Sequence, residues 1–245
     1  MSDSFQPVAR RSVSDDVFAE LRDAILVRRF APGDLLPPER DLAASFAVNR
    51  HAVREALKRL QQAGFVHVVH GGGTRVLDVR QDAGLDLLVH IATASEDVDP
   101  AIIRDGLEMR RAVGVDAARL AAVRADAPAR RRIADAAAAY GATDTSADAS
   151  SEADRSFWLE VVDASGNLAF RLALNSLVHA IDARPHVMDQ LLADDRADTV
   201  RHADLASAIT ARDPDRAAVV ADRILTQALD AWARMPATHA ARGAS

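Results

Sequence analysis

The sequence predicts a mostly α-helical protein, with three helices and a β-hairpin at the N-terminus followed by an all-α helical bundle. Over most of the 245 residues, apolar side chains recur at the three- and four-residue spacing of amphipathic helices. Two β-prone runs on either side of Gly71–Gly73 are the exception. With 11 glycines, 9 prolines and 1 tyrosine, an all-β fold is disfavoured, because strands favour aromatic residues and frequent turns.

The composition excludes several classes of protein. The chain is 49% hydrophobic and 27% charged, as globular proteins are. It has no run of ~18 apolar residues and no signal-peptide pattern at its start, so we expect a cytoplasmic protein that does not enter a membrane. Cysteine is absent, which excludes disulfides, thiol nucleophiles and cysteine-based zinc sites.

Residues 1–78 are predicted to form a small N-terminal domain. Apolar positions between residues 12 and 30 have helical spacing and predict the first helix. Pro32-Gly33 ends that pattern. Residues 39–45 follow two prolines, which are tolerated at a first helical turn, and predict a short second helix.

A third helix is predicted from Asn49, which can cap it, to about Ala63, before Gly64. Its two faces differ in character. The apolar face carries Val53, Ala56, Leu57 and Leu60. The opposite ridge carries Arg50, Arg54 and Lys58 at steps of four residues, with Asn49 and His51 at its N-terminal end. A charged ridge by itself is as typical of a solvated helix face as of a binding surface.

The runs 65–70 and 74–78 around the glycines predict a β-hairpin. Three helices and a hairpin make a winged helix-turn-helix, whose last helix enters the major groove of DNA. The net charge of −6 hides a local excess of cations, since residues 40–59 hold five basic and two acidic side chains. Arginine can pair with guanine, and asparagine or histidine can donate to phosphates.

The N-terminal motifs resemble the DNA-binding domain of GntR-family regulators over about residues 12–78. The matching segments are PGDLLPPERDLA (32–43), VNRHAVREAL (48–57), GFV (64–66) and HGGGT (70–74). The resemblance implies double-stranded operator DNA as the partner. It assigns operator contacts to Arg40, Asn49, Arg50, Arg54, His70 and Gly71, and the helical ridge adds His51 and Lys58.

Beyond a polar linker at 79–84, residues 85–236 are predicted to be all-helical and 237–245 to be a disordered tail. Residues 141–150 are small and polar, which is typical of a mobile loop. The predicted helices cover residues 85–94, 100–125, 128–140, 151–164, 168–182, 186–192, 199–211 and 214–235.

This second part is similar to the helical effector domain, called FCD, of the FadR branch of the same family. The matching segments are LEMR (107–110), AARLAA (117–122), DRSFW (154–158), ASGN (164–167), His202 and DPDRAA (213–218). The resemblance implies six or seven helices around a ligand cavity. Gly114 departs from a glutamate that is common at its place in relatives.

Many FCD domains bind a divalent metal through one aspartate and three histidines. Asp154 and His202 match two of these ligands, but Trp158 and Ile224 stand at the other two places. An indole N–H can only donate and isoleucine has no lone pair, so we expect no metal cofactor. His179, on a neighbouring predicted helix, is left as an alternative ligand.

Without a metal, the cavity is expected to take a more hydrophobic effector, such as a fatty acid or acyl-thioester, which metal-free relatives sense. The candidate effector-binding residues are Arg110, Asp154, Trp158, Asn175 and His202. The alternative is that Trp158 and Ile224 fill the cavity as core.

We therefore predict a homodimeric, ligand-responsive transcriptional regulator, preferably a repressor, that reads paired half-sites. A metal-dependent regulator that responds to small carboxylates is the alternative. An enzyme is disfavoured because no nucleophile–base constellation is present. An architectural DNA binder is disfavoured because residues 79–245 hold 26 acidic and 19 basic side chains. A protein-interaction module would leave the cationic ridge unexplained.

Overall fold

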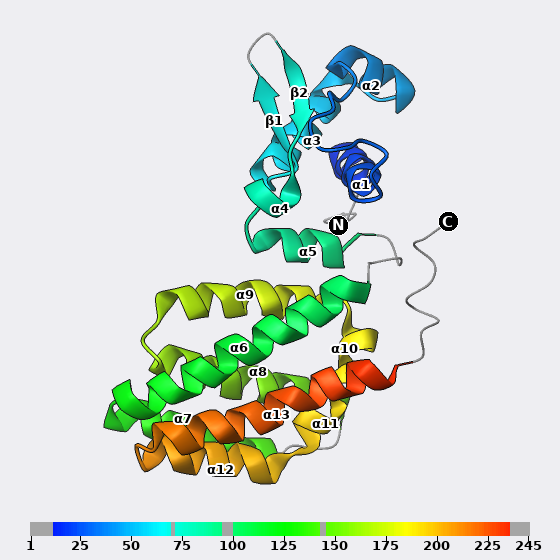
Figure 1. The fold of residues 1–245 in the computed structure, drawn as a ribbon. Coiled ribbons are helices and arrows are strands. Elements are labelled where there is room, and N and C mark those ends of the chain that lie inside the picture. The colour runs from blue at the N-terminus through cyan, green and yellow to red at the C-terminus, as the bar shows by residue number, and fades with distance from the viewer. Residues whose placement is uncertain (1–11, 70–71, 95–99, 143–145, 236–245) are drawn as a thin grey trace, which may run out of the picture. The chain divides into compact units, whose positions relative to one another are not determined.

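The computed structural model describes residues 12–69, 72–94, 100–142 and 146–235. His70, Gly71 and the predicted tail at 237–245 lie outside these residues. The described chain divides into two units, one that ends with α5 and one that begins with α6 (Figure 1). None of the described helices is long and apolar enough to cross a membrane.

The first unit is a winged helix-turn-helix, as the sequence predicts. Its core includes Phe18 of the first helix, Leu60 of the third and Phe65 of the hairpin. Gly64 adopts a left-handed φ of 77° just after the third helix, and Phe65 N–H closes the turn on the Leu60 carbonyl at 2.9 Å. The elements are α1 (Val13–Leu26), α2 (Glu39–Ser45), α3 (Arg50–Gln62), β1 (Val66–Val69), β2 (Gly73–Val76), α4 (Val79–Asp82) and α5 (Asp86–Ala92).

Residues 79–94 differ from the prediction, which makes 79–84 a linker and 85–94 the first helix of the second domain. The segment 79–84 contains the single-turn helix α4. The helix α5 packs in the first unit, where the ring of His90 lies 5.6 Å from that of Phe18 and 5.9 Å from that of Phe65. Arg22 also donates to Thr93 Oγ1 at 3.3 Å. The first unit therefore uses α5 to complete its core, whereas the sequence predicts residues 85–94 in the second domain.

The second unit is an all-α bundle in which α6 packs against α8, α9, α12 and α13. Alanines at 117, 118 and 121 of α6 are fully buried, and their small side chains let the neighbouring helices approach closely. The elements are α6 (Pro100–Arg124), α7 (Ala127–Ala142), α8 (Ala147–Ala164), α9 (Leu168–Asp182), α10 (Pro185–Leu191), α11 (Ala193–Ala197), α12 (Thr199–Thr210) and α13 (Pro214–Arg234).

The local structure of this unit differs from the predicted elements at two places. The expected loop at 141–150 is shorter, because α7 continues to Ala142 and Ser146 caps α8 by accepting from the Ala149 N–H at 3.3 Å. The segment before α12, which none of the predicted helices covers, forms α11. That short helix brings Asp195 and Arg196 into the interior, where both are buried.

Candidate functional site

One face of α3 carries the predicted DNA-contact residues, and the opposite face is core. Val53, Ala56 and Leu60 are fully buried, which fixes the helix from behind. The cationic face is exposed, and it consists of Arg40 on α2, the N-cap residue Asn49, and Arg50, His51, Arg54 and Lys58 on α3. A rigid helix with an exposed row of cations can present them together to a polyanion.

The cations of this face have exposed acidic partners. Arg54 Nη2 lies 2.9 Å from Glu39 Oε2, and the hydrogen bond and the charge of Glu39 raise the pKa of Arg54. Lys58 Nζ lies 2.8 Å from Glu55, and Arg40 Nε lies 3.0 Å from Asp41. Exposed pairs of this kind contribute little to stability, so phosphates can replace the carboxylates at small cost.

Arg50 differs from these cations, because none of the described residues forms an ion pair with it. It occupies the first position of α3, directly after the cap. Asn49 Oδ1 accepts from the Ala52 N–H at 2.8 Å, which leaves the Asn49 amide donors available. The positive end of the helix dipole adds to the attraction for an anion at this end of the face.

A second candidate site is a cavity in the second unit, between α6, α8, α9, α11 and α13. It is small, with a volume of about 40 Å³. Much of its wall is apolar, and the residues of that part are Val113, Val162, Leu174, Leu177, Val178, Ile181 and Leu225. The polar lining is formed by Arg110, Ser151, Asp154, Arg155, Asp182 and Arg196, with Trp158 beside them.

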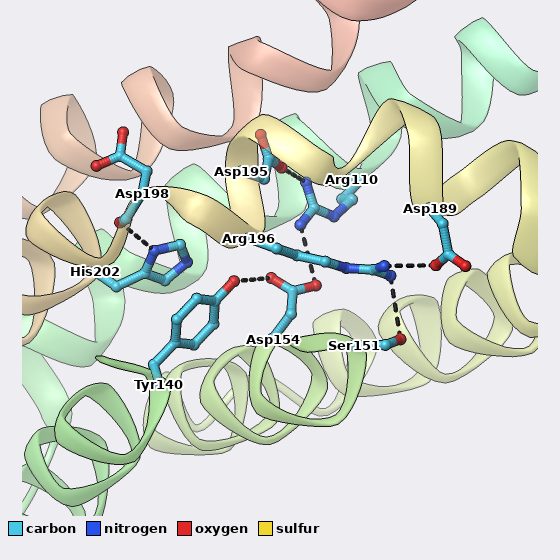
Figure 2. A network of polar contacts seen from close by, with 9 residues as sticks. All are labelled: Arg110, Tyr140, Ser151, Asp154, Asp189, Asp195, Arg196, Asp198 and His202. Atoms are coloured by element: carbon cyan, nitrogen blue, oxygen red, sulfur yellow. Dashed lines mark hydrogen bonds and ion pairs between the residues drawn. The ribbon is translucent and has the colours of Figure 1, made fainter. Parts of the chain in front are cut away.

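Arg110 is the centre of a buried ionic network at the polar end of this cavity (Figure 2). Its Nη1 lies 2.6 Å from Asp195 Oδ2, and its Nη2 lies 3.5 Å from Asp154 Oδ2. Tyr140 Oη donates to Asp154 Oδ1 at 3.3 Å. Burial disfavours the charged form of Arg110, but the two carboxylates outweigh it and raise the pKa of this guanidinium.

Burial also shifts the pKa values of Asp195, Tyr140 and His202. Burial raises the pKa of Asp195 to about 6, although the charge of Arg110 opposes this shift. Burial and the nearby Asp154 carboxylate also raise the pKa of Tyr140, so its hydroxyl remains a donor. Burial lowers the pKa of His202 and keeps that ring neutral near pH 7.

Arg196 is held beside Arg110 by a separate set of contacts, which Figure 2 also shows. Its Nη1 lies 2.7 Å from Asp189 Oδ1, and its Nη2 donates to Ser151 Oγ at 3.1 Å. The guanidinium therefore links α11 to α8 and α10. Two arginines from different helices are thus fixed at one end of the cavity.

The residues at the family's metal position do not fit a metal ion. Tyr140 stacks on the His202 ring with 4.1 Å between ring centroids and donates to Asp154 Oδ1, so the Asp154 carboxylate is already engaged by a hydrogen-bond donor. His202 Nδ1 donates to the Asp198 carbonyl at 2.8 Å and its Nε2 has no hydrogen-bond partner among the described residues, so His202 contributes one nitrogen that could bind a metal, which is too few for a site. Arg110 already supplies a positive charge beside Asp154. The described residues contain no group of three or more metal-ligating side chains, and the alternative ligand His179 is exposed.

The place of the expected glutamate is closed by packing. A Cβ added at Gly114 would overlap Leu225 Cδ1 and lie 3.3 Å from Trp158 Cζ3. Trp158 and Leu225 therefore occupy the volume that a longer side chain at this position would need.

Comparison with known proteins identifies the two units. The family model described as bacterial regulatory proteins of the gntR family matches residues 13–76, and the FCD domain model matches residues 105–227. The chain belongs to the GntR family. It is a DNA-binding transcriptional regulator with a helix-turn-helix domain and an FCD effector domain.

Relatives of this GntR-family regulator support the assignment. The HTH-type transcriptional regulator Mce2R of Mycobacterium tuberculosis is 35% identical over 224 residues, which are 91% of this chain and 92% of that one. A fatty acid metabolism regulator protein of Edwardsiella ictaluri is 33% identical over 171 residues, 65% of this chain and 66% of that one. The solved structure of Lar, which controls the Listeria monocytogenes agr system, has the same fold, with a TM-score of 0.59, 16% identity, and coverage of 94% of this chain and 100% of that chain.

The structure brings some of the predicted effector residues together and separates others. Arg110, Asp154 and Trp158 line the cavity. His202 is fully buried behind Tyr140, and Asn175 is half-buried on α9; neither belongs to the cavity lining. Ile224 is fully buried in the core.

Sequence reasoning missed Tyr140, Ser151, Asp195 and Arg196 in this network. Tyr140 is the only tyrosine of the chain, which is a weak signal for a special role. Asp195 and Arg196 lie in a polar segment whose pattern resembles an ordinary surface, and only the fold shows that they are buried.

Proposed function

We propose that this GntR-family regulator is a homodimeric repressor that binds operator DNA through the cationic face and leaves it when a lipid-like effector enters the cavity. Its recognition helix α3 is capped, packed from behind and exposed along its cationic face, so the first unit by itself presents the surface that would bind DNA. In this proposal the effector acts by favouring a conformation that binds DNA less well.

The homodimer follows from the size of the DNA-binding surface. One helix-turn-helix unit reads a single half-site, and selective binding usually comes from a two-fold dimer on a palindromic operator. Within each half-site, Arg50 is the side chain best placed to read a guanine, because none of the described carboxylates holds it.

The observation that carries the choice of effector is the apolar wall of the cavity. Seven aliphatic side chains and the ring of Trp158 surround the space. The similarity to fatty acid metabolism regulator proteins agrees with an acyl chain as the apolar body.

The cavity is smaller than the ~300–1,000 Å³ typical of ligand sites, so an acyl chain must move the helices apart to enter it. That movement gives the effector a different affinity for the two conformations, which is the condition for shifting their populations.

The DNA part of the proposal is tested by fluorescence anisotropy with an operator selected from random duplexes. Arg50→Ala is expected to weaken operator binding by about 5- to 150-fold, the range for loss of one arginine–guanine pair at ~1–3 kcal/mol. Arg29→Ala removes the same charge from the loop after α1 and is the matched control, with a much smaller effect. Equal losses in the two variants would contradict a specific contact by Arg50.

The effector part is tested by adding decanoate, a ten-carbon fatty acid, to the preformed protein–operator complex. Release of the operator at decanoate concentrations below its micelle-forming range is the expected result. A complex that tightens would indicate an activator or co-repressor mode, and a complex that does not respond would contradict the lipid-like effector.

A further inference from the structure

The pair between Arg54 and Glu39 on the cationic face has a geometry that the other exposed pairs of this face lack. Arg54 Nε lies 3.3 Å from each carboxylate oxygen of Glu39, and Arg54 Nη2 lies 2.9 Å from Glu39 Oε2. Lys58 and Arg40 each donate to their carboxylates through a single nitrogen. A carboxylate that engages two nitrogens of a planar guanidinium fixes its orientation as well as its position.

The carboxylate and the guanidinium come from two helices that the core holds together. Glu39 is the first residue of α2, and Arg54 lies 15 positions later on α3. Behind them, Leu42 of α2 is 4% exposed and Val53 of α3 is fully buried, and both belong to the same hydrophobic cluster. Because neither helix can shift freely, Glu39 sets the direction in which Arg54 points.

The pair leaves one edge of the Arg54 guanidinium open. Glu39 occupies the edge formed by Nε and Nη2. Among the described residues, no acceptor is bonded to Arg54 Nη1, and the side chain of Arg54 is 59% exposed. The edge formed by Nη1 and the other side of Nη2 can therefore donate two parallel hydrogen bonds while Glu39 stays bound. Guanine presents two acceptors, O6 and N7, that match this edge.

We infer that Glu39 is a positioning residue that orients Arg54 to read one guanine in each operator half-site. The inference rests on the proposed function, because it concerns the same DNA-binding face. A side chain that is ordered in the free protein loses less conformational entropy when it binds. Arg50 differs in this respect, because none of the described carboxylates orders it before DNA arrives.

The charge of Glu39 favours a base over a phosphate as the target of Arg54. A carboxylate beside the guanidinium weakens its attraction for a phosphate and itself repels the phosphate. The edge of guanine is neutral and is not repelled. The alternative role for Glu39 is to stabilise the start of α2 through the helix dipole, where Asp41 lies in the same turn. That role requires no contact with Arg54 and does not affect the choice of base.

Fluorescence anisotropy of the full-length protein tests the inference, with the selected operator and a set of duplexes that each have one base pair replaced. Arg54→Ala locates the guanine. At that base pair the replacement should cost the wild type about 5- to 150-fold in affinity and the variant almost nothing. Glu39→Gln keeps the size of the side chain and removes its charge. At the same base pair it should reduce the discrimination by about 2- to 12-fold, the cost of ordering one long side chain.

Glu55→Gln is the matched control, because it removes the carboxylate partner of Lys58. The Glu55 and Glu39 side chains are 40% and 36% exposed. Either substitution removes one negative charge from the cationic face, so both variants should bind a random duplex at least as tightly as the wild type. Lysine carries a point charge on a flexible stem. Glu55→Gln should therefore leave the discrimination unchanged at every base pair, whereas Glu39→Gln changes it at one.

The double variant of Glu39→Gln and Arg54→Ala tests whether Glu39 acts through Arg54. It should discriminate at the located base pair as Arg54→Ala alone does. Wild-type discrimination in Glu39→Gln, or an equal loss at every base pair, would overturn the positioning role. If Arg54→Ala weakened binding to all duplexes alike and lowered the salt dependence by about one phosphate contact, Arg54 would bind a phosphate and the reading of guanine would be overturned. A wild-type protein that prefers no duplex would overturn the proposed function itself.

Discussion

Gly114→Ala is the substitution that best tests how the cavity is packed. Gly114 lies in the interior of α6, where an added Cβ would overlap Leu225 Cδ1 and lie 3.3 Å from Trp158 Cζ3. Leu225 is 1% exposed and Trp158 is 4% exposed, so neither can turn into solvent to make room. The new methyl group therefore requires Leu225 Cδ1 to move, either toward the cavity that Leu225 also lines or with strain in the core.

Two effects of opposite sign determine how much Gly114→Ala changes the free energy of unfolding. Replacing glycine by alanine in a helix interior stabilises by about 1 kcal/mol. Overpacking a close-packed core by one methyl group costs about 1–3 kcal/mol. We therefore expect Gly114→Ala to destabilise the second unit by up to about 2 kcal/mol. In a Leu225→Ala background the overlap is gone, and the same change should stabilise by about 1 kcal/mol.

Urea denaturation followed by tryptophan fluorescence measures this effect in the relevant unit, because both tryptophans, Trp158 and Trp232, lie in it. Gly106→Ala is the control on the same helix, since an added Cβ there meets nothing within 4 Å. It should stabilise both backgrounds alike. If Gly114→Ala stabilised the wild-type background as much as Gly106→Ala does, the packing of Leu225 against Gly114 would be refuted.

Two further predictions concern protons and metals. Because the pKa of Asp195 is raised in the folded state to about 6, its contribution to stability is complete below its unfolded pKa of 3.8 and is lost as the pH rises through about 6. The free energy of unfolding of the wild type, relative to Asp195→Asn, should therefore fall between pH 4 and 6 in urea titrations; a constant difference would contradict the shift. The melting temperature should not change with EDTA, zinc or nickel, and a rise of several degrees would contradict the poor fit to a metal.

The recognition helix could be predicted from the sequence because each of its features is local. Asn49 caps it, Gly64 ends it with a positive φ, and Val53 and Leu60 repeat on one face. The exposed position of Arg50 then follows from helical geometry alone. Whether these side chains contact DNA bases stays a prediction, which the substitutions above test.

The polar end of the cavity could not be predicted in the same way. Asp195 meets Arg110 across 85 positions of sequence, and Arg196 meets Ser151 across 45. No local pattern specifies such pairs, because each side chain alone resembles a surface residue. The helix α11 is also too short for a periodicity to reveal it. The same limit applies to α5, whose periodicity predicts a helix but not its contacts with Phe18 and Phe65, which lie far from it in the sequence.

The residues around the cavity fit together sterically, because the size of each side chain depends on that of its neighbours. The large Trp158 fits because Gly114 opposite it has no side chain, and Leu225 fills the rest of that space. The resemblance to metal-binding FCD domains places a metal-ligating histidine at position 158. The indole of Trp158 has no lone pair for a metal and offers an N–H hydrogen-bond donor instead. The positive charge that a metal would supply is supplied by Arg110, which Asp195 and Asp154 hold in place.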